Sequence, residues 1–137
     1  MTKKILCPID GTAHSQIALI AAAELAAKYG AELSVCVVNI AHGGGRGPLI
    51  HHWTDVEMQK ILADASAVVT AQGLTLAHSA EVIDREAASG IVGYAEANGI
   101  DHIVMGTGDK RGLSRLMLGS VAADVAARAH CSVTVAR

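Results

Sequence analysis

Short apolar runs alternate along the chain with segments whose apolar residues recur at helical spacing. The apolar runs predict five buried strands, at residues 4–9, 33–38, 74–82, 103–105 and 133–135. The helical spacing predicts helices at residues 15–29, 54–72, 85–97 and 121–130. Strands that are apolar on both faces are typical of a parallel sheet covered by helices on both sides. We therefore predict one α/β domain over residues 1–137, a doubly wound, five-stranded parallel sheet.

Local signals set the bounds of the helices. Ser15 is a suitable N-cap for the first helix, and Thr54-Asp-Val-Glu57 forms a capping box for the second. Between the second strand and this box, residues 39–53 predict a long loop. Its glycine-rich part, residues 43–47, is the only segment that we expect to be flexible.

Composition and charge narrow the function classes. The formal net charge of the 137 residues is −2, aromatic residues make up 2%, and no long basic run occurs, so nucleic-acid binding is not expected. No apolar segment is long enough to span a membrane, and the N-terminus lacks the features of a signal peptide. Cys7, Cys36 and Cys131 are widely spaced and form no C-x-x-C pair. We therefore expect a cytoplasmic protein with reduced, buried cysteines.

A glycine-rich, cationic segment links the fourth strand to the last helix. Residues 106–120 read GTGDKRGLSRLMLGS, with glycines at 106, 108, 112 and 119 and with Lys110, Arg111 and Arg115 between them. Backbone N–H groups at the start of a helix favour anions. The segment matches neither the P-loop nor the dinucleotide fingerprint. These residues alone therefore do not decide whether the segment binds phosphate or forms a purely structural turn.

Asp10 directly follows the first strand. In a doubly wound sheet, ligands bind at the carboxyl ends of strands where the strand order reverses. If strands one and four flank that point, Asp10 and Gly106 face one another across a crevice. The alternative is that the Asp10 side chain only caps the turn that follows it.

The histidines do not predict a metal site or a catalytic site. His42, His51 and His52 lack a regular ligand spacing, which favours solvated loop residues. His14, Ser15 and Asp10 lie within one local turn, and no G-x-S-x-G elbow is present. We therefore assign no catalytic residue and no metal ligand.

Three segments resemble the universal stress protein family: KILCPIDGT at residues 4–12, GIDHIVMGT at 99–107 and GLSRLMLGSV at 112–121. The resemblance covers the whole chain. It implies the strand order 3-2-1-4-5 and a homodimer, commonly made through the C-terminal edge strand. Many members of the family bind ATP, with or without magnesium, and others bind no nucleotide.

The members that bind ATP share the sequence pattern G-x-x-G-x(9)-G-[ST], and this chain resembles that pattern in part. Gly106, Gly119 and Ser120 match, whereas Asp109 stands where the second glycine is expected and Gly108 lies one residue early. A carboxylate beside bound phosphates weakens binding unless it turns outward or meets a metal ion. By the same resemblance, Lys110 or Arg111 would cover the phosphates.

At the other end of the ligand, the resemblance places the adenine. Asp10 matches the acidic position that contacts adenine in binding members, and Gly11 follows it in the same turn. Val38 or its neighbour would line the adenine slot. Asn39 receives no role.

The expected function is therefore that of a cytoplasmic stress-response protein that binds an adenine nucleotide, ATP in the first place, at the carboxyl ends of strands one and four. Two alternatives stay open: a nucleotide-free dimeric module that binds an unknown protein partner, and a slow ATP hydrolase. The apolar last strand lies at a sheet edge in this order, so we expect it to pair antiparallel with its copy in a homodimer.

Overall fold

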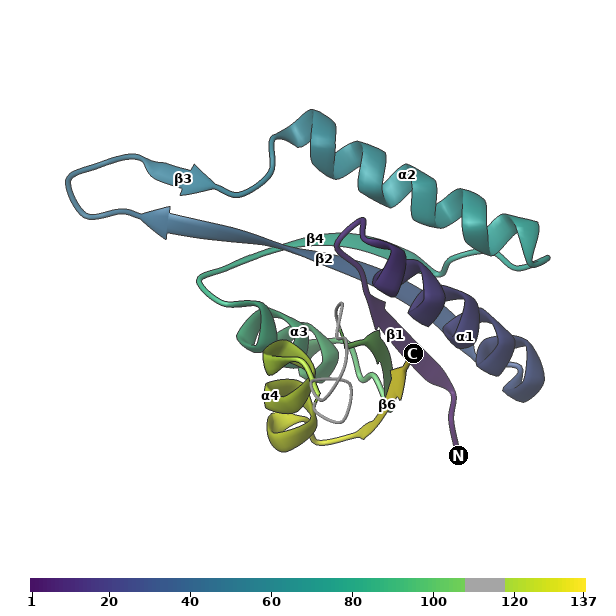
Figure 1. Ribbon diagram of the computed structural model, residues 1–137. Coiled ribbons are helices and arrows are strands. Elements are labelled where there is room, and N and C mark those ends of the chain that lie inside the picture. The colour runs from purple at the N-terminus through teal and green to yellow at the C-terminus, as the bar shows by residue number, and fades with distance from the viewer. Residues whose placement is uncertain (108–117) are drawn as a thin grey trace, which may run out of the picture.

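The computed structural model describes residues 1–107 and 118–137 and shows a twisted sheet between two layers of helices (Figure 1). Five parallel strands lie in the spatial order β4 (His78–Asp84), β2 (Glu32–Gly43), β1 (Lys4–Pro8), β5 (His102–Gly106) and β6 (Ser132–Ala136). In chain order these are the third, second, first, fourth and fifth predicted strands. The predicted α/β class and strand order are confirmed.

The predicted loop over residues 39–53 is wrong. β2 continues to Gly43, and a further strand, β3 (Leu49–His51), pairs antiparallel with its end, His42 lying opposite Ile50. All three residues of β3 are exposed, so no pattern of buried positions marks this strand in the sequence. The hairpin projects from the body of the sheet (Figure 1).

Four helices cover the sheet: α1 (Ala13–Tyr29), α2 (Asp55–Ala71), α3 (Ala87–Ala97) and α4 (Ser120–Arg128). The first two lie on one face and the last two on the other (Figure 1). Each face has its own apolar core, with Ile5 and Leu19 fully or almost fully buried in one, and Leu6 and Val125 in the other. No helix in the described part of the chain is long and apolar enough to cross a membrane.

Two threonines cap the helices on the α1–α2 face. Thr12, rather than the predicted Ser15, is the N-cap of α1, because its side chain accepts a hydrogen bond from the Ser15 backbone N–H at 3.3 Å. At the start of α2 the predicted capping box between Thr54 and Glu57 is confirmed. Hydrogen bonds from the backbone and side chain of Thr54 lower the pKa of Glu57 below its ordinary value.

The remaining differences concern the ends of elements. The third predicted strand begins at His78 instead of residue 74, because the preceding segment, including Leu74 and Leu76, packs against the α1–α2 core before the ladder starts. α3 begins at Ala87 instead of residue 85, because Asp84 Oδ1 accepts hydrogen bonds from the next two backbone N–H groups. α4 runs over 120–128 instead of 121–130.

The three cysteines are free thiols. Cys7 and Cys36 are fully buried in neighbouring strands, and Cys131 is partly buried. Burial raises the pKa of Cys36 to about 12 and raises that of Cys7 further. Both buried thiols therefore stay protonated and act as core residues.

Candidate functional site

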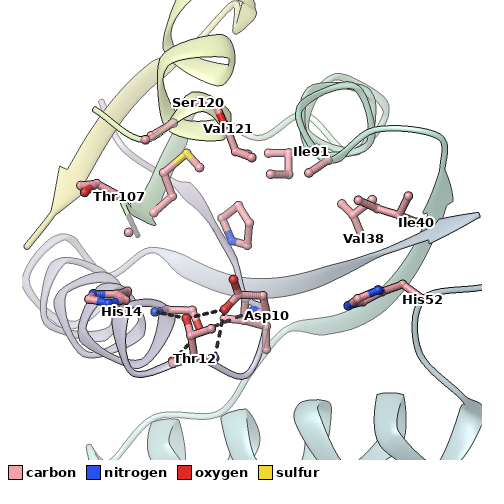
Figure 2. Close-up of a pocket in the computed structure, with 18 of the residues that line it drawn as sticks. Asp10, Thr12, His14, Val38, Ile40, His52, Ile91, Thr107, Ser120 and Val121 are labelled. Atoms are coloured by element: carbon pink, nitrogen blue, oxygen red, sulfur yellow. Dashed lines mark hydrogen bonds between the residues drawn. The ribbon is translucent and has the colours of Figure 1, made fainter. Parts of the chain in front are cut away.

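A cavity of about 760 Å³ opens at the carboxyl ends of β1, β2 and β5 (Figure 2). This is the point where the strand order reverses, and ligands of open α/β sheets bind there. The cavity is also bordered by the segment before α2 and by the first turns of α1, α3 and α4. Its two ends differ in chemistry.

We call one end the β5 end; it consists of His14, Gly106, Thr107, Gly119 and Ser120. Two backbone segments approach each other closely here. A Cβ atom on Gly106 would lie 2.7 Å from the His14 carbonyl oxygen, and one on Gly119 would overlap the Thr107 carbonyl oxygen. Only glycine fits at either position.

The start of α4 is directed to the β5 end of the cavity. Gly119 is the N-cap, and no side chain of the described residues caps the helix. The first turn of α4 carries no acidic residue. Its backbone N–H groups and the positive end of the helix dipole therefore favour an anion at this end.

We call the opposite end the β2 end; it consists of Val38, Ile40, His52 and Ile91. Figure 2 shows Val38, Ile40 and His52 together, well separated from Thr107 and His14. Val38 is 8% exposed and Ile91 3%. Apolar side chains and one imidazole therefore form a wall suited to a flat, apolar group.

Asp10 lies between the two ends, where it both caps the turn and lines the cavity. Its Oδ1 accepts hydrogen bonds from the Thr12 backbone N–H at 3.0 Å and from the Thr12 hydroxyl at 2.6 Å, so it stabilises the turn into α1. The same side chain is exposed and lines the cavity (Figure 2). The turn occupies Oδ1 and leaves Oδ2 toward the cavity as a possible acceptor.

Asn39, to which the sequence assigned no role, is buried and bonds to the partly buried Trp53 and to the exposed Glu81. It is 2% exposed, and its Nδ2 donates to the Trp53 carbonyl at 3.1 Å and to Glu81 Oε2 at 2.8 Å. Its Oδ1 accepts from the Trp53 backbone N–H at 2.9 Å. We call Asn39, Trp53 and Glu81 the Asn39 cluster. It joins the end of β2 to the segment before α2.

The other predicted site residues fall in three places. Val38, Gly106, Gly119, Ser120 and Asp10 line the cavity, as expected of a site at this edge. Gly11 does not line it; it borders a second hollow of about 270 Å³ between α1 and α2, and its φ of 81° is explained by the turn. Gly108, Asp109 and Lys110 lie outside the described residues.

His52 is exposed and lies in the loop between β3 and α2, as expected of a solvated loop residue, but its position at the cavity was not predicted. It borders the cavity together with Trp53. The signal that could have found it is the return of the chain to the sheet edge along β3, which the sequence did not reveal. Within the described residues, no three histidine, cysteine or acidic side chains come together as a metal site.

Comparison with known proteins agrees with the fold. A model of the universal stress protein family matches residues 1–137. The chain belongs to this family. The universal stress protein MJ0531 of Methanocaldococcus jannaschii is 35% identical over 98% of this chain and 82% of its own length.

Solved structures of universal stress proteins share the fold. One, a universal stress protein in complex with cAMP, superposes with a TM-score of 0.78 at 20% identity and covers 98% of this chain and 97% of its own. Another, from Archaeoglobus fulgidus in complex with dAMP, has a TM-score of 0.73 at 22% identity and covers 100% and 98%. At such identities the likeness establishes the fold of this universal stress protein.

Proposed function

We propose that this universal stress protein binds an adenine nucleotide, ATP in the first place, in the cavity at the carboxyl ends of β1, β2 and β5. The observation that carries the proposal is the pairing of an anion-favouring helix start with an apolar wall in one cavity. A nucleotide has the same two parts, a phosphate chain and a flat base.

The phosphates would lie at the β5 end. The close approach at Gly106 and Gly119 brings backbone to the cavity surface, and the uncapped start of α4 offers N–H donors. The Ser120 hydroxyl would add one more donor. Lys110 or Arg111, which lie outside the described residues, would add positive charge to these donors.

The base would lie at the β2 end, between the apolar wall and Asp10. Asp10 Oδ2 would accept a hydrogen bond from the adenine amino group. Guanine carries a carbonyl oxygen at that position, and two acceptors repel each other. The site is therefore expected to prefer adenine to guanine.

The size of the cavity is suitable for this ligand. Small-molecule sites enclose roughly 300–1,000 Å³, and this cavity has about 760 Å³. The relatives solved with cAMP and with dAMP support the choice of an adenine nucleotide.

Calorimetric titration tests the proposal, combined with mass spectrometry of small molecules released from purified, denatured protein. We expect ATP to bind, with and without magnesium, and GTP to bind more weakly. Absence of binding for every adenine nucleotide, together with no released ligand, would refute the proposal and favour a nucleotide-free interaction module. Steady conversion of bound ATP to ADP would instead indicate the slow hydrolase.

We further propose a two-fold homodimer through β6. This strand pairs with β5 on one side, and four of its five residues are partly buried although it ends the sheet. An edge strand without proline is a template for pairing with another strand. Sedimentation of the wild type and of Val133→Pro tests this, with circular dichroism to monitor folding. A wild-type monomer at micromolar concentration would refute the dimer.

A further inference from the structure

The segment His52–Trp53 connects β3 to α2 and is held against the sheet edge by backbone hydrogen bonds. The His52 N–H donates to the Ile40 carbonyl at 2.8 Å, and both backbone groups of Trp53 bond to the Asn39 side chain. This segment is therefore fixed at the cavity rim, although no regular element contains it.

The chemistry of the Asn39 cluster determines how the amide is oriented. The Glu81 carboxylate, when ionised, can only accept a hydrogen bond, so it must meet the NH₂ group of Asn39. The amide oxygen then faces the Trp53 N–H at 2.9 Å. In the described part of the chain, no buried side-chain nitrogen or oxygen lacks a partner. Only an asparagine side chain offers this set of donors and acceptor at this length.

The Asn39 cluster in turn fixes the His52 ring. The imidazole lies edge-on to the Trp53 indole, with ring centroids 4.6 Å apart and an angle of 76° between the planes. Trp53 packs against the apolar core on the α1–α2 face. The exposed His52 ring thus lies against Trp53 and borders the same end of the cavity as Val38 and Ile40 (Figure 2).

We propose that His52 is a base-contacting residue that sets the preference of the site for a purine, and that Asn39 is the residue that positions it. This inference rests on the proposed function. An aromatic ring held at the rim of an apolar slot presents its π surface to a second aromatic ring. A purine offers a larger surface to this ring than a pyrimidine does.

The test compares His52→Ala with His51→Ala, using adenosine, inorganic tripolyphosphate, ATP and CTP in calorimetric titrations. His51 is the neighbouring exposed residue on β3 and does not line the cavity, so it is a matched control. We expect His52→Ala to weaken ATP and adenosine binding by the same factor, about 5- to 20-fold, near the lower part of the range for base stacking. We expect tripolyphosphate to bind unchanged, the ATP-to-CTP preference to fall, and His51→Ala to behave as wild type.

A second variant tests the positioning role of Asn39. Asn39→Asp places a carboxylate beside Glu81 and removes the donor to the Trp53 carbonyl, which should release the segment. We expect adenosine affinity to fall as in His52→Ala while tripolyphosphate affinity is kept. If Asn39 only stabilised the fold, Asn39→Asp would change the affinities for both adenosine and tripolyphosphate, or neither of them. Trp53 is the only tryptophan of the chain, so its fluorescence reports directly on adenosine binding.

The outcomes separate this inference from the proposed function. If wild-type protein binds ATP but His52→Ala binds ATP and adenosine equally well, the role of His52 is refuted and the nucleotide site stands. If wild-type protein binds no nucleotide, the proposed function fails and this inference fails with it.

Discussion

The two ends of the cavity are built in different ways. At the β5 end, glycines bring backbone to the surface, and the start of α4 supplies backbone N–H donors. At the β2 end, side chains form the wall, and the hydrogen bonds of the buried Asn39 hold the segment that carries His52 and Trp53. The comparison teaches that the first end depends on backbone fit and the second on a hydrogen-bond network.

The largest effect on stability is expected at the β2 end, for Asn39→Ala. This substitution leaves the N–H and the carbonyl of the partly buried Trp53 without their partner, whereas water can solvate the exposed Glu81 carboxylate. Unsatisfied buried polar groups cost roughly 1–3 kcal/mol each, so we expect the free energy of unfolding to fall by about 2–4 kcal/mol. Denaturant titration measures the loss.

Asn98→Ala is the matched control for this prediction. The Asn98 side chain is exposed and donates to the Tyr94 carbonyl at 2.9 Å. Its removal should change stability by no more than about 0.5 kcal/mol. Equal losses for the two variants would contradict a special role for the Asn39 cluster.

The next largest effect is expected at the β5 end, for Gly106→Ala. The new methyl group would lie 2.7 Å from the His14 carbonyl oxygen, which belongs to the backbone and cannot simply move aside. Overpacking of this kind costs about 1–3 kcal/mol. Gly93→Ala, in an α3 position with open space around it, should instead stabilise the protein by up to about 1 kcal/mol. Thermal or chemical unfolding of both variants distinguishes backbone fit from general intolerance to alanine.

Between the two ends, Asp10→Asn tests the ligand without disturbing the turn. Asparagine keeps an oxygen that can accept from Thr12, as Oδ1 does now. It replaces the other carboxylate oxygen by an NH₂ group and removes the negative charge of the side chain. We expect ATP affinity to fall by about 1–2 kcal/mol with stability little changed, because one charged hydrogen bond is lost. Unchanged affinity for ATP in calorimetry would remove Asp10 from the site.

The smallest effect is expected at the start of α2, which directly follows the segment His52–Trp53 at the β2 end of the cavity. Thr54→Ala removes the N-cap of that helix and should lower Tm by about 2–6 °C. The difference from wild type should be pH-dependent. Because the folded-state pKa of Glu57 is lowered, the stability from its bonds to Thr54 is fully present above its ordinary value of 4.5 and is lost as the pH falls through the folded value.

Melting curves at neutral pH and below pH 4.5 test the pH dependence. Adenosine affinity should be unchanged in Thr54→Ala, because Asn39 rather than the helix cap fixes Trp53. A loss of adenosine affinity as large as that of Asn39→Asp would show that the helix start, and not the Asn39 cluster, controls the β2 end.

The sequence predicted the parts of this molecule that depend on local patterns. Apolar runs indicated the strands, the family resemblance implied their order, and the glycines at 106 and 119 stand in the motif of that family, so the sheet and the β5 end could be expected. β3 could not be predicted, because its three residues are exposed and no pattern of buried positions marks it in the sequence. In the Asn39 cluster, Asn39 bonds to Trp53, 14 positions further along the chain, and to Glu81, 42 positions further along. No local sequence pattern connects these residues.

The central claim is that one cavity holds a base at the β2 end and phosphates at the β5 end. Backbone amide chemical shifts recorded by NMR during separate titrations with adenosine, tripolyphosphate and ATP test it most directly. We predict that adenosine shifts the amides of Val38, Asn39, His52 and Trp53, that tripolyphosphate shifts those of Gly119, Ser120 and Val121, and that ATP shifts both sets. Shifts by ATP confined to the hollow between α1 and α2, or identical sets for adenosine and tripolyphosphate, would contradict the account.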